Sequence, residues 1–120
     1  SYPWPKYDQI VVRNFVSGAM ENTTASVFYS GLNLTAAQHE DHNQDDIIAH
    51  ELYHHWFGNL VTCESWSHLS LNESFATYGE YLWREHKNGK EDADEHLFRM
   101  AESYFSYAKN RDADVIRFNY

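Results

Sequence analysis

The centre of the chain reads His50-Glu51-Leu52-Tyr53-His54, and the acidic pair Asp45-Asp46 stands just before it. Acidic side chains favour the first turn of a helix, and the apolar residues of 47–57 recur near a 3.6-residue period. We therefore predict a helix that begins near Asp45 and ends near Gly58-Asn59. Residues four apart in a helix lie about 40° from each other, so both imidazoles project from one face.

Two imidazoles on one helix face can bind the same metal ion. A catalytic zinc ion takes three protein ligands and keeps one position open, so a third ligand must come from elsewhere. Glu73 is the strongest candidate, because it opens a second predicted helix and the intervening chain can return antiparallel to the first. His50, His54 and Glu73 are therefore predicted to hold one zinc ion. The alternative is a solvated helix face in a histidine-rich chain.

Glu51 lies about 100° from His50 around the helix, close enough to flank the metal without binding it. Zinc lowers the pKa of a bound water toward about 7 and polarises a scissile carbonyl. Glu51 is then the predicted general base, which accepts the proton of the water and later returns it to the leaving amine. The spacing thus indicates a hydrolytic zinc site.

The rest of the chain predicts short strands followed by helices. β-branched and aromatic residues favour strands at 7–16 and 25–29, and the small residues between them allow another backbone to approach closely. The polar stretch 31–43 is predicted to be a loop. A second helix is predicted at about 72–87, stopped by an Asn-Gly pair, and a third at about 92–109. The second helix is expected to pack through one apolar stripe, namely Leu71, Phe75, Tyr78 and Leu82.

Composition narrows the class of protein. The 120 residues suit one domain, and 42% apolar and 17% aromatic residues supply a core. The 18 acidic and 9 basic side chains give a formal charge of −9, which disfavours nucleic acid and anionic lipid partners. We expect a soluble chain without a membrane segment or signal peptide. The compartment is undetermined, since the single cysteine, Cys63, can form no internal disulfide.

Three stretches carry a resemblance to a known enzyme family. They are Gly18-Ala19-Met20-Glu21-Asn22, the run from His50 to Thr62, and Leu71-Asn72-Glu73-Ser74-Phe75-Ala76. With these motifs the sequence resembles the M1 family of zinc aminopeptidases, the aminopeptidase N type among the gluzincins. The resemblance covers most of residues 3–83. It implies an α+β, thermolysin-like catalytic domain of which residues 1–120 form a part, with one bound zinc ion.

The resemblance also implies a substrate-binding role for the first motif. Glu21 is expected to bind the free α-ammonium group of a peptide, because only the first residue of a chain carries that charge. The backbone around Gly18 and Ala19 is expected to hydrogen-bond the substrate as an added strand, and Met20 and Asn22 complete the motif. The expected partners are peptides with a free N-terminus. The alternative for Glu21 is a solvated turn residue.

Members of the family are larger, and the chain looks like a segment cut from such a protein. An N-terminal β domain and a C-terminal helical domain are expected to lie outside it, and the oxyanion-stabilising tyrosine of the family is expected beyond Tyr120. We therefore expect the isolated fragment to be inactive and to self-associate through exposed apolar faces. Within the matched region, Thr23-Thr24 stand in place of the usual Trp-Gly, and His68 and Ser70 in place of an Asp and a Trp.

Two other functions remain open. A thermolysin-type endopeptidase shares the metal ligands but does not need Glu21 to bind an ammonium group. A metal-bearing structural domain would need no turnover at all. Cleavage of free and N-acetylated peptides separates the first alternative from an aminopeptidase.

Overall fold

The structure is a computed structural model that describes residues 1–41 and 44–111. It has the α+β order that the sequence predicts, with strands first and helices after. None of the helices in these two ranges combines the length and the apolarity of a membrane span. Along the chain the elements are β1 (Asp8–Val12), β2 (Ala19–Met20), β3 (Ala25–Tyr29), the 3-10 helix η1 (Ser30–Leu32), α1 (Ala36–Asp41), α2 (Asp45–Tyr53), the 3-10 helix η2 (Trp66–His68), α3 (Ser70–Asn88) and α4 (Lys90–Arg111).

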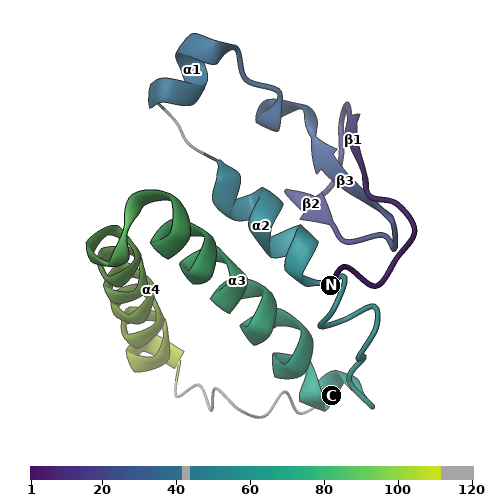
Figure 1. Cartoon of the computed structure of the whole chain (residues 1–120). Coiled ribbons are helices and arrows are strands. Elements are labelled where there is room, and N and C mark those ends of the chain that lie inside the picture. The colour runs from purple at the N-terminus through teal and green to yellow at the C-terminus, as the bar shows by residue number, and fades with distance from the viewer. Residues whose placement is uncertain (42–43, 112–120) are drawn as a thin grey trace.

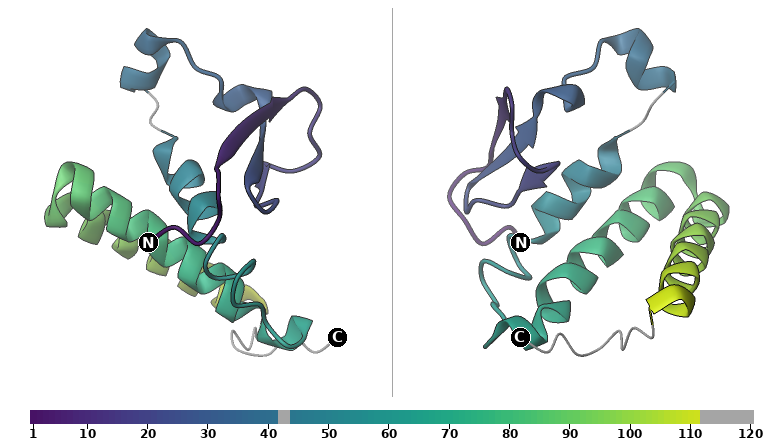
Figure 2. Two further views of the ribbon diagram at one scale, coloured as in Figure 1. Left: turned by 45° about the vertical axis from the view of Figure 1, so that its right-hand side comes forward. Right: turned by 180° about the vertical axis from the view of Figure 1, so that it is seen from behind.

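Helix α2 lies between the small sheet and α3, and α4 packs on α3 farther out (Figures 1 and 2). Helix α3 runs antiparallel to α2, which brings its N-terminal end beside the C-terminal end of α2 (Figure 1). This return of the chain is the arrangement that the metal-site prediction requires.

The sheet has the strand order β1-β3-β2, with β1 parallel and β2 antiparallel to β3. Strand β3 matches the predicted range, whereas β1 is shorter than predicted and ends at Val12. Asn14 adopts a positive φ of 56°, which turns the chain out of the strand direction. Ala19 and Met20, within the stretch between the two predicted strands, form the edge strand β2 instead of a simple connection.

Thr24 closes the turn between β2 and β3 with a φ of 69°. A β-branched residue is rarely found in this left-handed region, and the cost is about 1 to 2 kcal/mol. A glycine, which the M1 resemblance places at this position, adopts the same φ without that cost. The departure from the family pattern therefore leaves the turn in place but strains its backbone.

The prediction that residues 31–43 form a loop is wrong, because α1 lies within this stretch. Thr35 and Gln38 form a capping box: the backbone N–H of Thr35 donates to Gln38 Oε1 at 3.0 Å, and the N–H of Gln38 donates to Thr35 Oγ1 at 3.4 Å. A Thr-x-x-Gln spacing is a recognised helix start. The Thr-x-x-Gln spacing was therefore visible in the sequence, but the loop prediction followed the polar composition of the stretch instead.

Helix α2 ends at Tyr53, earlier than the predicted end near Gly58. The stretch from His50 to His54 therefore lies at the C-terminal end of the helix and not in its middle. The chain continues in turns until Gly58, whose φ of 133° redirects the backbone. The ring of His54 takes part in this turn, because its Nδ1 lies 3.0 Å from the carbonyl oxygen of Phe57. The carbonyl oxygen of Phe57 thus contacts the ring of His54 instead of a backbone N–H of a continuing helix.

The face that α3 buries is not the predicted apolar stripe. Asn72, Ala76 and Gly79 are buried, whereas Phe75 and Tyr78 are 42% and 51% exposed. A Cβ atom at Gly79 would lie 2.4 Å from Cγ of Tyr53, so only glycine permits this approach of α3 to α2. The small residues therefore set the distance between the two helices that carry the site.

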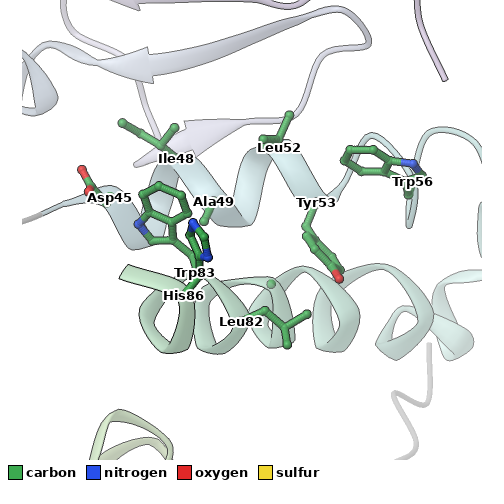
Figure 3. A pocket seen from close by; sticks show the side chains of 10 residues that line it. Asp45, Ile48, Ala49, Leu52, Tyr53, Trp56, Leu82, Trp83 and His86 are labelled. Atoms are coloured by element: carbon green, nitrogen blue, oxygen red, sulfur yellow. The ribbon is translucent and has the colours of Figure 1, made fainter. Parts of the chain in front are cut away.

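An apolar cavity of about 430 Å³ lies between α2 and α3 (Figure 3). Its walls come from residues 45–56 on one side and 79–86 on the other. None of its lining residues is one of the predicted metal ligands. The cavity therefore belongs to the helix interface and is separate from the chemistry described next.

Candidate metal centre

Three donor atoms converge where the end of α2 meets the first turn of α3. Nε2 of His50 lies 3.1 Å from Nε2 of His54, and Oε2 of Glu73 lies 3.3 Å from the first and 3.5 Å from the second. Donors held tetrahedrally at about 2.0 to 2.2 Å from zinc lie about 3.3 to 3.6 Å apart. The three predicted ligands therefore have the chemistry and the spacing that one zinc ion requires.

Both histidines are held in orientation by their other ring nitrogen. Nδ1 of His50 lies 2.7 Å from Oε1 of Glu80, and Nδ1 of His54 lies 3.0 Å from the carbonyl oxygen of Phe57. These acceptors favour a proton on Nδ1, which leaves the lone pair of Nε2 available to a cation. Glu80 is a functional residue that the sequence motifs do not indicate. Its only signal was its position two helical turns after Glu73, on the same face of α3.

Replacing Glu80 by glutamine is expected to weaken zinc binding between about 10- and 100-fold, the range found when outer partners of metal-bound histidines are removed. Glutamine keeps the size of the side chain but removes the charge that orients His50. Competition with a chromogenic chelator on the intact protein measures the effect. Glu85→Gln, on an exposed part of the same helix, is the matched control and should leave zinc affinity unchanged. Unaltered affinity in Glu80→Gln would contradict the assignment.

The donors also form a charge network. Burial lowers the pKa of His50, but hydrogen bonds to Glu73 and Glu80 outweigh it and raise the pKa to about 10. Burial likewise opposes the charge of His54, whose pKa is nevertheless raised by Glu73 and by a backbone hydrogen bond. The same two histidines lower the pKa of Glu73 to about 2. The carboxylates thus stabilise positive charge here, which a divalent cation supplies in place of two protons.

Glu51 lies beside the donors but faces a different environment. Its side chain is buried, and Oε2 has no hydrogen-bond partner among the described residues. Burial raises its pKa to about 7, although the nearby charges of His50 and His54 act in the opposite direction. A buried carboxylate with one free oxygen and a pKa near neutrality has the properties of a general base.

Glu21 reaches the same centre from the sheet. Donor atoms of Glu21, Glu51 and His54 all lie within 4.8 Å of one another. A cavity of about 560 Å³ is lined by residues 17–21 on one side and by the metal donors on the other. Gly18, Ala19, Met20 and Glu21 therefore share one cavity with the candidate ligands.

Asn22, the last residue of the same motif, does not line this cavity. It is exposed, and its carbonyl oxygen accepts a hydrogen bond of 2.8 Å from the N–H of Ala25 in the turn before β3. The sequence analysis missed a second asparagine, Asn59, whose Nδ2 donates to the carbonyl oxygen of Glu21 at 2.8 Å. This bond ties the turn after α2 to the end of β2. Asn59 therefore holds the backbone of Glu21 in place.

His55 follows the donor His54 in the sequence, but its ring nitrogens contact Tyr2 and Ser26 instead of the metal donors. It is completely buried, with Nδ1 2.7 Å from the hydroxyl of Tyr2 and Nε2 3.3 Å from the hydroxyl of Ser26. Burial lowers its pKa, so the ring stays neutral. Its role is to join α2 to the N-terminal segment and to β3.

Two histidines one turn apart and a glutamate from the next helix are the metal ligands of one class of hydrolytic zinc enzymes, and such sites also have a glutamate beside the metal. Comparison with known sequences agrees with this class. The Peptidase family M1 domain matches residues 1–118. The chain belongs to peptidase family M1.

Individual proteins with similar sequences are aminopeptidases. The chain is 46% identical to Aminopeptidase M1 of Arabidopsis thaliana over 85 residues, which cover 68% of the chain and 10% of that protein. It is 47% identical to human (Homo sapiens) Aminopeptidase N over 87 residues, covering 68% and 9%. The chain thus spans about a tenth of the length of these curated relatives.

Solved structures extend the likeness to the fold. The M1 zinc metallopeptidase from Deinococcus radiodurans matches with a TM-score of 0.69 and 26% identity, over 98% of this chain and 23% of that one. A mutant of that enzyme bound to a Tyr-Ser-Ala substrate matches with a TM-score of 0.63 and 28% identity, over 90% and 21%. The arrangement of strands and helices described above is therefore that of a segment of an M1 peptidase.

Proposed function

We propose that this chain forms the metal centre and the ammonium-binding site of a zinc-dependent aminopeptidase. The observation that carries the proposal is the convergence of His50, His54 and Glu73 within 3.5 Å of one another, with Glu51 and Glu21 at the same cavity. Residues 1–120 are proposed to be part of a thermolysin-like catalytic domain. The reaction is hydrolysis of the first peptide bond of a peptide.

The bond-breaking chemistry is divided between the metal and Glu51. His50, His54 and Glu73 would hold a zinc ion, which would supply Lewis acidity to the scissile carbonyl and lower the pKa of the attacking water. Glu51 takes up the proton of that water at its unpartnered Oε2 and later delivers it to the leaving amine. Burial supports this role, because it raises the pKa of Glu51 and makes its carboxylate a stronger base.

Glu21 is proposed to select the first residue of the substrate. Its carboxylate lies within 4.8 Å of Glu51, so an ammonium group paired with Glu21 stands next to the bond that Glu51 acts on. A longer chain on the N-terminal side of that bond has no ammonium group at this distance and leaves the charge of Glu21 uncompensated. The reaction then removes single residues from a free N-terminus.

The substrate backbone is proposed to add to β2. In the described sheet, β2 pairs with β3 along one edge only, and residues 17–21 line the cavity. An extended peptide can therefore hydrogen-bond to Gly18 and Ala19 as a further strand. Met20 belongs to the same edge, and Asn22 is proposed to support the turn that positions it. The Tyr-Ser-Ala substrate of the Deinococcus relative is a peptide of the kind proposed.

Acetylated peptides test the assignment against a thermolysin-type endopeptidase. With the intact protein, N-acetylation of a short peptide is expected to lower kcat/KM by about 30-fold or more, because losing one partner of a desolvated charge pair costs about 2 kcal/mol or more. Steady-state assays on matched free and acetylated peptides measure this ratio. Equal cleavage of the two would refute the aminopeptidase assignment.

The variant Glu21→Gln tests whether Glu21 is the residue that distinguishes free from acetylated peptides. It should reduce the discrimination between free and acetylated peptides, while zinc affinity stays unchanged because Glu21 is not one of the three proposed ligands. Glu91→Gln on the exposed start of α4 is the matched control and should keep the discrimination of the parent. A Glu21→Gln protein with full discrimination would place ammonium recognition elsewhere.

For the isolated 120 residues we propose zinc binding without measurable turnover, and association through exposed apolar side chains. Val16, Trp66 and Phe105 are 100%, 67% and 66% exposed, which is unusual for large apolar residues. The oxyanion-stabilising tyrosine that the family resemblance places beyond the chain would also be missing. Peptidase activity of the isolated segment, or a monomer at all concentrations in sedimentation, would contradict these two expectations.

A further inference from the structure

The polar contacts between α2, α3 and α4 form two layers that are one helical turn apart. In the outer layer, Arg84 of α3 donates to Asp46 of α2 from Nε at 3.1 Å and from a terminal nitrogen at 2.6 Å, and to Asp92 of α4 at 2.9 Å. Each of these residues has a counterpart four positions away on its own helix. The counterparts are His50, Glu80 and His96.

These counterparts form the inner layer, which contains a candidate zinc ligand. Oε1 of Glu80 lies 2.7 Å from Nδ1 of His50, and Oε2 lies 3.4 Å from Nε2 of His96. The three side chains are 20%, 17% and 19% exposed, so water screens them only partly. Glu80 thus stands between a histidine that faces the metal centre and a histidine that comes from α4.

His96 has a polar atom that its packing alone does not explain. Its Nε2 is buried and makes no hydrogen bond within the described residues, and an oxygen of Glu80 lies 3.4 Å away. A buried polar atom without a hydrogen-bond partner destabilises the folded state. An apolar side chain would fill the same place without that cost, and the charged atom that Nε2 of His96 approaches is Oε2 of Glu80.

We propose that His96 is a positioning residue of the zinc centre. Its Nε2, 3.4 Å from Oε2 of Glu80, restrains that carboxylate by electrostatic attraction, which leaves Oε1 directed at Nδ1 of His50 and Nε2 of His50 available to the cation. The inference rests on the proposed zinc site. It adds a third helix, α4, to the two that carry the ligands.

The zinc affinity of the intact protein tests the proposal through His96→Phe and His96→Gln. Phenylalanine keeps the ring but has no donor, and we expect a zinc dissociation constant about tenfold higher, at the lower end of the effects of removing outer partners. Glutamine places an amide N–H at similar reach and is expected to restore the affinity to within about threefold. Chelator competition gives the constants, and thermal unfolding without added zinc reports whether each variant is folded.

Asp92→Asn is the matched control, because it weakens the outer layer on the same helix without touching Glu80. It should lower the unfolding temperature but leave zinc affinity unchanged. Parental affinity in His96→Phe would overturn the proposal, and so would an equal loss in Asp92→Asn, which would indicate general loosening of α4. If the parent itself binds no zinc, the proposed function fails, and that outcome is distinct from failure of the His96 inference alone.

Discussion

Replacing Glu51 by glutamine is expected to lower kcat by about 10²- to 10⁴-fold while the protein retains its zinc, because this is the range contributed by a general acid–base group. Glutamine has the shape of glutamate but cannot accept the proton of the attacking water. Burial has already given Glu51 a pKa of about 7, which suits this transfer. The measurement is kcat on a free peptide together with zinc content per chain.

The control for this experiment is Glu102→Gln, an exposed carboxylate on α4, which should keep both the parental rate and the metal. Loss of zinc from Glu51→Gln would mean that Glu51 helps to bind the metal, which would contradict the division of roles proposed here. A parental rate with zinc retained would remove Glu51 from the mechanism altogether.

Replacing Glu73 by alanine is expected to raise the zinc dissociation constant by more than about 100-fold, beyond the effect of losing an outer partner, and to abolish activity at low zinc. The side chain supplies the only oxygen among the three converging donors and pairs with both histidines, at 3.3 and 3.5 Å. Without it, two imidazoles remain with no negative charge at the metal. Excess zinc should restore only part of the rate.

Ser74→Ala is the matched control, since it changes the adjacent exposed residue of α3 without altering a donor. It is expected to bind zinc like the parent. If Glu73→Ala bound one zinc ion per chain with the affinity of the parent, Glu73 would not be a ligand and the proposed ligand set would be wrong. The contrast between a Glu51 variant that keeps its metal and a Glu73 variant that loses it separates the base from the ligand.

The helices were predictable where a local signal was strong. The Asn-Gly stop after the second predicted helix is confirmed, since Gly89 follows α3 with a φ of 95°. The Thr35-x-x-Gln38 capping box of α1 was equally local, but it was overlooked in a polar stretch. The early end of α2 was not predicted: after Tyr53 the N–H groups of His55 and Trp56 donate to carbonyl oxygens three residues back, and the apolar period of the sequence does not distinguish these turns from an α-helix.

The residues around the candidate metal centre likewise divide into those that local sequence predicts and those that it does not. The pairing of His50 with His54 follows from helix geometry alone, since any helix places residues four apart on one face. Glu80, Asn59 and His96 carry no such signal. Each acts across a contact between separate elements, and the identity of its partner depends on how those elements are aligned.

The donor types, their spacing on one helix face and the family motif around Glu21 can be predicted without a structure, because they depend on local backbone geometry and side-chain chemistry. The buried face of α3 and its position along α2 depend instead on packing between the helices. That register is set by contact between Gly79 and Tyr53, where any side chain larger than hydrogen would clash. Since the register places Glu73 and Glu80 opposite His50, long-range packing and not local sequence positions the candidate metal centre.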